Sequence, residues 1–168
     1  MKIRGNKGFT LIELLIVVAI IGIIAAIAVP GLLRARMSGN EASAIGSLRA
    51  INTAQQNYAQ QCNGYSGTLI DLRVAGNFLS PDLTQVAAPV KSGYTIVLNV
   101  GTGALLAPQP SGCLASGSGY YSSAVPLSVG STGTRAFATN AQGTIWQNTV
   151  GTAPPEPFVV GGTIAPIQ

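Results

Sequence analysis

The chain has no histidine among its 168 residues and only two cysteines. Without histidine, His-dependent acid–base catalysis and His-ligated metal sites are excluded. A c-type haem attachment needs a C-x-x-C-H sequence, which is absent for the same reason. The stretch GTGALLAPQPSG contains glycines but lacks the spacing and the lysine of a phosphate-binding loop. We therefore expect no enzyme activity, no catalytic residue, no metal and no cofactor.

Charge is also scarce, because only 8% of the residues carry one. The five acidic residues are scattered, without the clustering of a calcium loop: Glu13, Glu41, Asp71, Asp82 and Glu156. Three of the nine basic residues, Lys2, Arg4 and Lys7, lie in the first eight positions, which leaves six basic residues against five acids. The net charge of +4 thus reflects the N-terminus, and we expect no nucleic-acid partner.

A long hydrophobic run follows this basic start. From Leu14 to Leu33 there are twenty residues without a charge, enough to cross a bilayer core as a helix. Glu13 stands at the start of the run. A carboxylate within a membrane segment costs roughly 2.5–3.5 kcal/mol on insertion scales. Glu13 therefore needs a function or a partner.

Three processing routes are compatible with this N-terminus. A secretory signal would be cut after Ala28, where Ala26 and Ala28 form a small-x-small pair. An uncut anchor would keep its basic end in the cytoplasm. Cleavage after Gly8 would make Phe9 a new N-terminus, whose amine lies one helical turn from Glu13. The partner amine would then come from the same chain or from a neighbouring copy.

Residues 5–35 resemble the start of the type IV prepilins and their pseudopilin relatives. The similarity rests on a short basic leader ending in Gly8, the sequence Phe9-Thr10-Leu11-Ile12-Glu13 and the apolar run. Gly22 and Pro30 also stand where this family commonly has a helix-weakening glycine and proline. The resemblance implies the α+β pilin-like fold, in which a long N-terminal helix packs on a small antiparallel sheet.

The resemblance further implies that a membrane prepilin peptidase cuts after Gly8 and N-methylates Phe9. It implies that Glu13 contacts the terminal amine of an adjacent subunit during assembly. It also implies that the stretch from Gly22 to Pro30 opens or melts as subunits pack. The plainer alternative for Pro30 is a tolerated kink in a membrane helix.

Helical periodicity continues beyond the apolar run. Apolar residues recur every three or four positions at Ala42, Ile45, Leu48, Ile51, Ala54 and Tyr58. Polar residues lie largely between them, at Ser43, Ser47, Asn52, Gln55 and Gln56. This pattern predicts an amphipathic helix, which we expect to end at Asn63-Gly64. The predicted segments are a leader (1–8), an assembly helix (9–35), an amphipathic helix (36–62) and a head (63–168).

The head reads as β-rich. YTIVLNV (94–100) alternates as a strand, and RAFATNAQGTIWQ (135–147) reads as a hairpin turning at Asn140–Gly143. GYYSSAVPLSV (119–129) is a weaker candidate, and the proline-rich C-terminus is expected to be an extended tail or an edge segment. We expect three or four antiparallel strands packed on the amphipathic helix.

Cys62 and Cys113 are expected to form a disulfide, since a membrane-targeted chain reaches an oxidising compartment. The alternative is two buried thiols. Arg34, Arg36 and Arg49 are either solvated or paired with an acid such as Glu41 of a neighbouring subunit.

The favoured function is a type IV pilus subunit. It would be a single-pass precursor in the bacterial inner membrane and then part of an extracellular helical filament. Its expected partners are further copies of itself, minor pilins, the prepilin peptidase and the inner-membrane assembly machinery. A periplasmic pseudopilin of a type II secretion system is the first alternative. A membrane-tethered binding module is the second.

Overall fold

The computed structural model describes residues 8–106, 109–114 and 116–167. The basic leader residues Lys2, Arg4 and Lys7 lie outside the described residues. The chain divides into two compact units, Met1–Ala35 and Arg36–Gln168. Helix α1 (Leu11–Cys62) contributes residues to both units.

The first unit contains the apolar part of α1. The helix begins at Leu11 and is assigned without a break through Gly22 and Pro30. It is the one helix, within the described ranges, that is long and apolar enough to cross a membrane, with a mean hydropathy of 3.1 over its most apolar 18 residues. Its large apolar side chains from Leu11 to Leu33 are 43–80% exposed. Such a surface is suited to lipid or to other apolar helices.

The end of α1 is confirmed where the sequence predicts it. The helix stops at Cys62, and Asn63 adopts a left-handed backbone with φ of 52°. Asparagine tolerates this conformation better than most residues, and Gly64 follows it.

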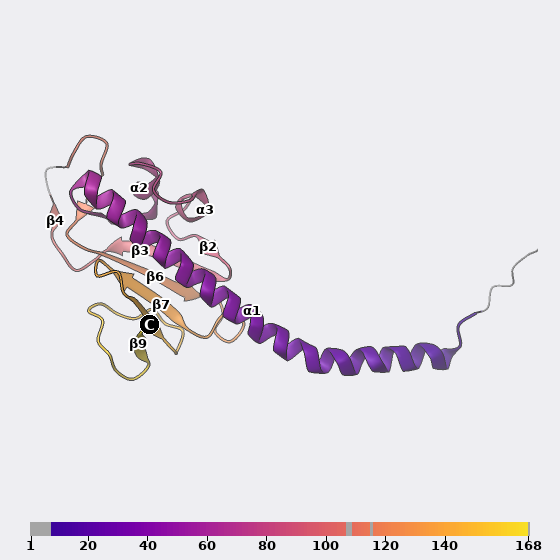
Figure 1. The fold of residues 1–168 in the computed structure, drawn as a ribbon. Helices are drawn as coiled ribbons and strands as arrows, with labels where there is room; N and C mark the ends of the chain where they lie inside the picture. Colours follow the sequence, from indigo (N-terminus) through magenta and orange to yellow (C-terminus); the bar gives the residue numbers. More distant parts are fainter. Residues whose placement is uncertain (1–7, 107–108, 115, 168) are drawn as a thin grey trace, which may run out of the picture. The chain divides into compact units, whose positions relative to one another are not determined.

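The second unit is built on a six-stranded antiparallel sheet with the order β2-β3-β6-β7-β8-β9 (Figure 1). Its strands are β2 (Val90–Lys91), β3 (Tyr94–Val100), β6 (Tyr120–Pro126), β7 (Ala136–Asn140), β8 (Ile145–Asn148) and β9 (Ile164–Pro166). The strand at 94–100 and the hairpin at 135–147 are confirmed, and the Gly143 amide donates to the Asn140 carbonyl across the turn at 2.8 Å.

The expectation of three or four strands is wrong. The additional strands β2 and β9 contain two and three residues, which is too short for an alternating pattern to be visible in the sequence. The C-terminal segment is an edge strand in part, because β9 pairs with β8.

Short elements that the sequence analysis did not predict follow α1. A second sheet has the order β1-β5-β4, from β1 (Tyr65–Ser66), β4 (Leu105–Leu106) and β5 (Ser116–Gly117). Helices α2 (Leu69–Val74) and α3 (Pro81–Thr84) complete the unit. Helix α2 is capped by Thr68, whose hydroxyl accepts a hydrogen bond from the Asp71 amide at 3.2 Å.

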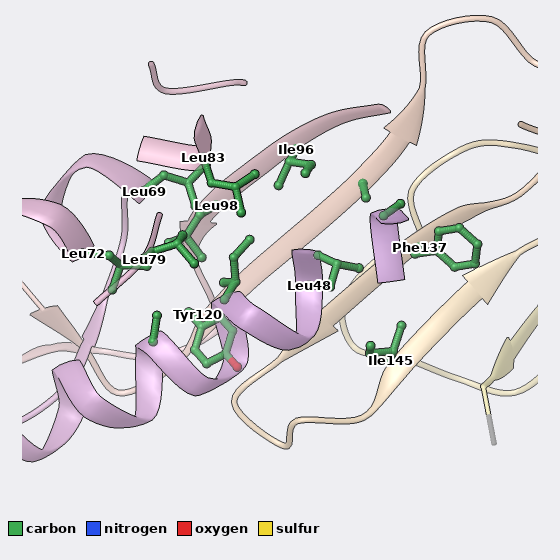
Figure 2. Close-up of a cluster of buried hydrophobic side chains, with 14 of the residues drawn as sticks. Leu48, Leu69, Leu72, Leu79, Leu83, Ile96, Leu98, Tyr120, Phe137 and Ile145 are labelled. Carbon is green, nitrogen blue, oxygen red and sulfur yellow. The ribbon is translucent and has the colours of Figure 1, made fainter. Parts of the chain in front are cut away.

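The core of the head lies between α1 and one face of the six-stranded sheet. In Figure 1 the C-terminal part of α1 crosses the sheet, and Figure 2 shows Leu48 between Tyr120 and Phe137. The fully buried helix residues include Leu48, Ile51 and Tyr58. Burying a side chain of this size contributes about 1.5–3 kcal/mol.

The predicted helix face is partly wrong. Ala42 is exposed and Ala44 is buried, so the buried stripe is turned from the predicted one at its start. Gln55 is also fully buried, where the periodicity placed a solvent-facing residue. Its side-chain amide accepts from the Ser66 amide at 2.9 Å and donates to the Ser66 carbonyl at 2.8 Å. These two bonds satisfy the buried amide and fix β1 against the helix.

The opposite face of the sheet is covered by the strap, which we define as residues 153–158. Tyr120 faces α1, since its hydroxyl donates to Asn52 Oδ1 at 2.8 Å, so the neighbouring Tyr121 faces away from the helix. The Tyr121 hydroxyl donates to the Pro154 carbonyl at 2.7 Å. Phe158 stacks on Trp146 with ring centroids 5.3 Å apart. The proline-rich C-terminus is thus folded back on the sheet.

One ion pair joins α1 to the loop before β7. Both Glu41 and the segment that begins at Thr134 lie in the second unit. The Glu41 carboxylate accepts from Arg135 Nη2 at 2.6 Å and Nε at 2.9 Å, and from the Thr134 amide and hydroxyl at 3.0 Å each. Glu41 is only 6% exposed. The hypothesis that Glu41 pairs with an arginine of a neighbouring subunit is therefore wrong, because Arg135 of the same chain occupies it.

The disulfide is confirmed. Cys62 and Cys113 are bonded, with their Cα atoms 5.5 Å apart, and the bond joins the end of α1 to the segment before β5. It closes a loop with a sequence separation of 51 residues. The alternative of two buried thiols does not hold.

Reduction of this disulfide is expected to lower the free energy of unfolding of the head by about 4 kcal/mol, on the chain-entropy model for a loop of this length. Urea unfolding of the detergent-solubilised chain, followed by the fluorescence of its single tryptophan, Trp146, measures the change. The double variant Cys62→Ser/Cys113→Ser is the control, because a reductant must leave it unaffected. Equal stability of the oxidised and reduced chain would contradict the prediction.

The Glu41 ion pair predicts an acid-sensitive head. Burial raises the pKa of Glu41, but the hydrogen bonds from Thr134 and Arg135 outweigh burial and hold that pKa below the ordinary value of 4.5. A carboxyl with a lowered pKa in the folded state adds stability that is complete above the unfolded-state value and is lost as the pH falls through the folded-state value.

We therefore expect the urea concentration at the unfolding midpoint to decrease as the pH is lowered below about 4.5. We expect the variant Glu41→Gln to be less stable than the wild type at pH 7, and its stability to depend less on pH. Urea titrations between pH 3 and 7 measure both (roughly the range in which carboxyls titrate). High salt serves as the control, since it screens the exposed Asp82–Lys91 pair more than the buried one. Parallel profiles of wild type and variant would refute the assignment.

Candidate functional site

The candidate site is the N-terminal end of α1. Gly8, Phe9 and Thr10 precede the helix in non-helical backbone, and all three are exposed. Phe9 is 86% exposed. A peptidase needs an accessible backbone outside regular secondary structure, and the Gly8–Phe9 peptide bond lies in such a segment.

Gly8 is not required by the chain's own packing. A Cβ atom added at Gly8 would meet no atom within 4 Å, and the same holds at Gly22 within α1. The absence of a side chain at these positions therefore relieves no contact among the described residues. Any need for glycine there arises from the local backbone or from another molecule.

Glu13 caps the first turn of α1 together with Thr10. Its Oε2 atom accepts from the Thr10 amide at 2.9 Å and from the Thr10 hydroxyl at 2.7 Å. The Glu13 amide in turn donates to Thr10 Oγ1 at 3.3 Å. This reciprocal arrangement is a capping box, which satisfies amide groups that have no partner within the helix.

The sequence analysis missed the role of Thr10, although the signal was present. Thr10-Leu11-Ile12-Glu13 has the S/T-x-x-E spacing that marks a capping box ahead of an apolar run. The position of Glu13 ahead of an apolar run suggests only a charged partner for its carboxylate. The structure gives it a neutral one.

Glu13 has no cationic partner among the residues that the structure describes. The ion pairs found there are Lys91–Asp82 and Arg135–Glu41. All hydrogen bonds of the Glu13 carboxylate go to Oε2, so Oε1 remains open in the described part of the chain. In this chain the nitrogen of Phe9 is part of the peptide bond to Gly8 and carries no charge.

The remaining candidate residues belong to other parts of the chain. Gly22 and Pro30 are on α1, and the helix is assigned through both, so their opening stays a prediction. Cys62 and Cys113 both lie in the second unit. No group of three or more potential metal ligands occurs within the described ranges.

A family model described as the prokaryotic N-terminal methylation motif matches residues 3–29. The chain is also similar to the type IV major pilin protein PilA of Myxococcus xanthus, with 48% identity over 61 residues, covering 36% of this chain and 28% of that protein. Its similarity to fimbrial protein Q of Moraxella bovis is 36% over 103 residues, covering 60% of this chain and 62% of the relative.

A third relative comes from a secretion apparatus. The type II secretion system core protein G of Aeromonas hydrophila is 32% identical over 68 residues, which cover 40% of this chain and 48% of that protein. The chain thus spans less than two thirds of the length of these curated relatives. No solved structure matches the chain.

Proposed function

We propose that this chain, which belongs through its N-terminal segment to the type IV pilin and pseudopilin family, is a structural subunit of a type IV pilus. One observation carries the proposal. An accessible Gly8–Phe9 bond precedes a helix of membrane length that has a carboxylate, Glu13, in its first turn. Two of the relatives named above are a type IV major pilin and a fimbrial protein by name, and we infer from them a structural, non-enzymatic role for this chain.

The first step is processing. A membrane prepilin peptidase hydrolyses the Gly8–Phe9 peptide bond, which leaves a carboxylate on Gly8 and an amine on Phe9. The same enzyme then transfers a methyl group from a sulfonium methyl donor to the Phe9 nitrogen, which loses a proton while the donor leaves as a thioether. The exposed, non-helical backbone at residues 8–10 supports this step. The open space around Gly8 supports the view that the peptidase, rather than the packing of this chain, requires glycine at this position.

The second step is assembly. The positively charged Phe9 amine of one copy pairs with Glu13 of an adjacent copy, at the Oε1 atom that the capping box leaves open. An unpaired carboxylate in an apolar environment has a high free energy. Copies whose Glu13 carboxylate is paired are therefore more stable than copies whose carboxylate is unpaired. The pairing therefore holds the axial register between subunits. A contact that repeats without closing generates a filament.

The apolar surface of α1 supports the same model. Residues 9–35 form the assembly helix, and neighbouring copies cover its exposed side chains when the chain leaves the membrane. Gly22 and Pro30 weaken the helix between them and allow that stretch to open during packing. Residues 36–62 and the head, residues 63–168, form the folded unit that the filament carries.

The model assigns a location and partners. The leader, residues 1–8, is removed at the bacterial inner membrane, where the precursor is a single-pass protein. The assembly machinery of that membrane then transfers it to an extracellular filament of this chain and minor pilins. The alternative is a periplasmic pseudopilus of a type II secretion system, which is supported by the similarity to core protein G.

Mass spectrometry of the N-terminal peptide in the sheared extracellular fraction of native cells tests the proposal. A methylated peptide beginning at Phe9 is expected in that fraction. The same peptide confined to membranes and periplasm would favour the pseudopilus. An uncut chain that begins before Gly8 would contradict both the pilus and the pseudopilus, and would leave a membrane-tethered binding module as the remaining hypothesis.

Removal of the Glu13 carboxylate is expected to impair assembly. The variants Glu13→Gln and Glu13→Ala should still be cut after Gly8, but should yield at least about tenfold less sheared filament, because a charge-assisted pair contributes about 1.5–3 kcal/mol. Immunoblots of the sheared and cellular fractions measure both effects. Thr10→Ser is the control, since it keeps the capping hydroxyl. Normal filament yield from Glu13→Gln would refute the pairing.

A further inference from the structure

A cleft of about 430 Å³ lies on the face of the sheet that points away from α1, beside the strap. It is lined by Asn99, Val100, Thr102, Tyr121, Pro155 and Glu156. Register places Asn99 opposite Tyr121 across β3 and β6, and Asn140 opposite Tyr121 across β6 and β7. These side chains therefore share the face from which the strap holds Glu156 over the sheet.

Glu156 is held in place by two hydrogen bonds. Its Oε2 atom accepts from the Thr102 amide at 3.1 Å, and its Oε1 atom accepts from Asn140 Nδ2 at 3.1 Å. Each carboxylate oxygen can accept about two hydrogen bonds, so each retains a free acceptor position. The side chain is half-buried and oriented before any ligand arrives.

The charge of Glu156 is not neutralised within the described part of the chain. No lining residue of the cleft is basic. The ion pairs in the described part of the chain involve the carboxylates of Asp82 and Glu41, not that of Glu156. The cleft thus presents a fixed negative charge, an aromatic ring from Tyr121 and the amide of Asn99. A planar guanidinium can take both free acceptor positions and can lie on the ring.

Arginines without a carboxylate partner are available on the same chain. Arg34, Arg36, Arg49 and Arg73 are all exposed, and none forms an ion pair with a described residue. In an assembly of identical copies every copy supplies both one Glu156 cleft and these arginines.

We propose that the Glu156 cleft binds the guanidinium group of an arginine side chain from a second copy of this chain. The inference rests on the proposed function, because the filament is what brings copies together. The contact holds the heads of neighbouring copies in register, as the Glu13 contact holds their helices.

Binding is tested first with acetyl-arginine amide, titrated into the full chain in detergent micelles and followed by NMR at the Thr102 amide and the Asn99 and Asn140 side-chain amides. Saturable shifts are expected, and Glu156→Gln should weaken binding by about tenfold, because it removes the charge. Acetyl-citrulline amide is the matched neutral probe and should not bind. Asp82→Asn removes an exposed carboxylate outside the cleft and should leave binding unchanged. Absence of saturable binding, or equal binding of the citrulline probe, overturns the proposal.

The source of the arginine is tested in filaments. Glu156→Arg is expected to reduce the yield or salt resistance of sheared filaments. One of the four second-site changes Arg34→Glu, Arg36→Glu, Arg49→Glu or Arg73→Glu should restore it. If the wild-type chain forms filaments and the Glu156→Arg variant forms them equally well, this inference is overturned and the proposed function stands. Probe binding without rescue by any of the four would exclude a second copy as the occupant. Failure of the wild-type chain to enter filaments would count against the proposed function instead.

Discussion

The packing of α1 on the six-stranded sheet is the contact on which the rest of the head depends. Several strands contain only two to five residues, and such strands are not stable without an apolar face buried against another element. Leu48, Ile51 and Tyr58 provide that cover on one face. The strap covers the opposite face through Pro154 and Phe158. The sheet is thus held between two segments that lie about a hundred residues apart in sequence.

The two parts of α1 have surfaces suited to different environments. In the first unit α1 has an apolar surface from Leu14 to Leu33, and in the second unit it has one buried stripe and a polar remainder. The change follows composition: no charge occurs between Leu14 and Leu33, and Arg34, Arg36 and Glu41 follow directly. A surface without polar groups is stable only in lipid or against similar helices, which is why the proposed function has a membrane stage and a filament stage.

The carboxylates show how context decides what a charge does. Glu13 caps its own helix, with no bond from a described residue to its Oε1 atom. Glu41 pairs with Arg135 and accepts from Thr134, and Glu156 is held by two neutral donors beside a cleft. Their spacing in the sequence excludes an acidic cluster but does not separate these three roles. The difference lies in the partners that the fold brings within hydrogen-bond distance.

Features set by local pattern were predictable from the chain alone. The apolar run gave the membrane-length helix, Asn63-Gly64 its end, and the alternation at 94–100 the strand β3. The Thr10 cap also had a local signal, which was overlooked. These features depend on residues within a few positions of one another, so periodicity and turn preferences are sufficient to reveal them.

The tertiary structure alone decided the rest. Burial of Gln55, the pairing of Glu41 with Arg135, the short strands β2 and β9 and the position of Glu156 all depend on segments distant in sequence. A polar side chain is stable inside a protein only when a remote backbone or side chain satisfies it. A two-residue strand forms only where a neighbouring strand supplies partners for its backbone hydrogen bonds. Such partners are chosen by the packing of the whole chain, and no local pattern in the sequence records them.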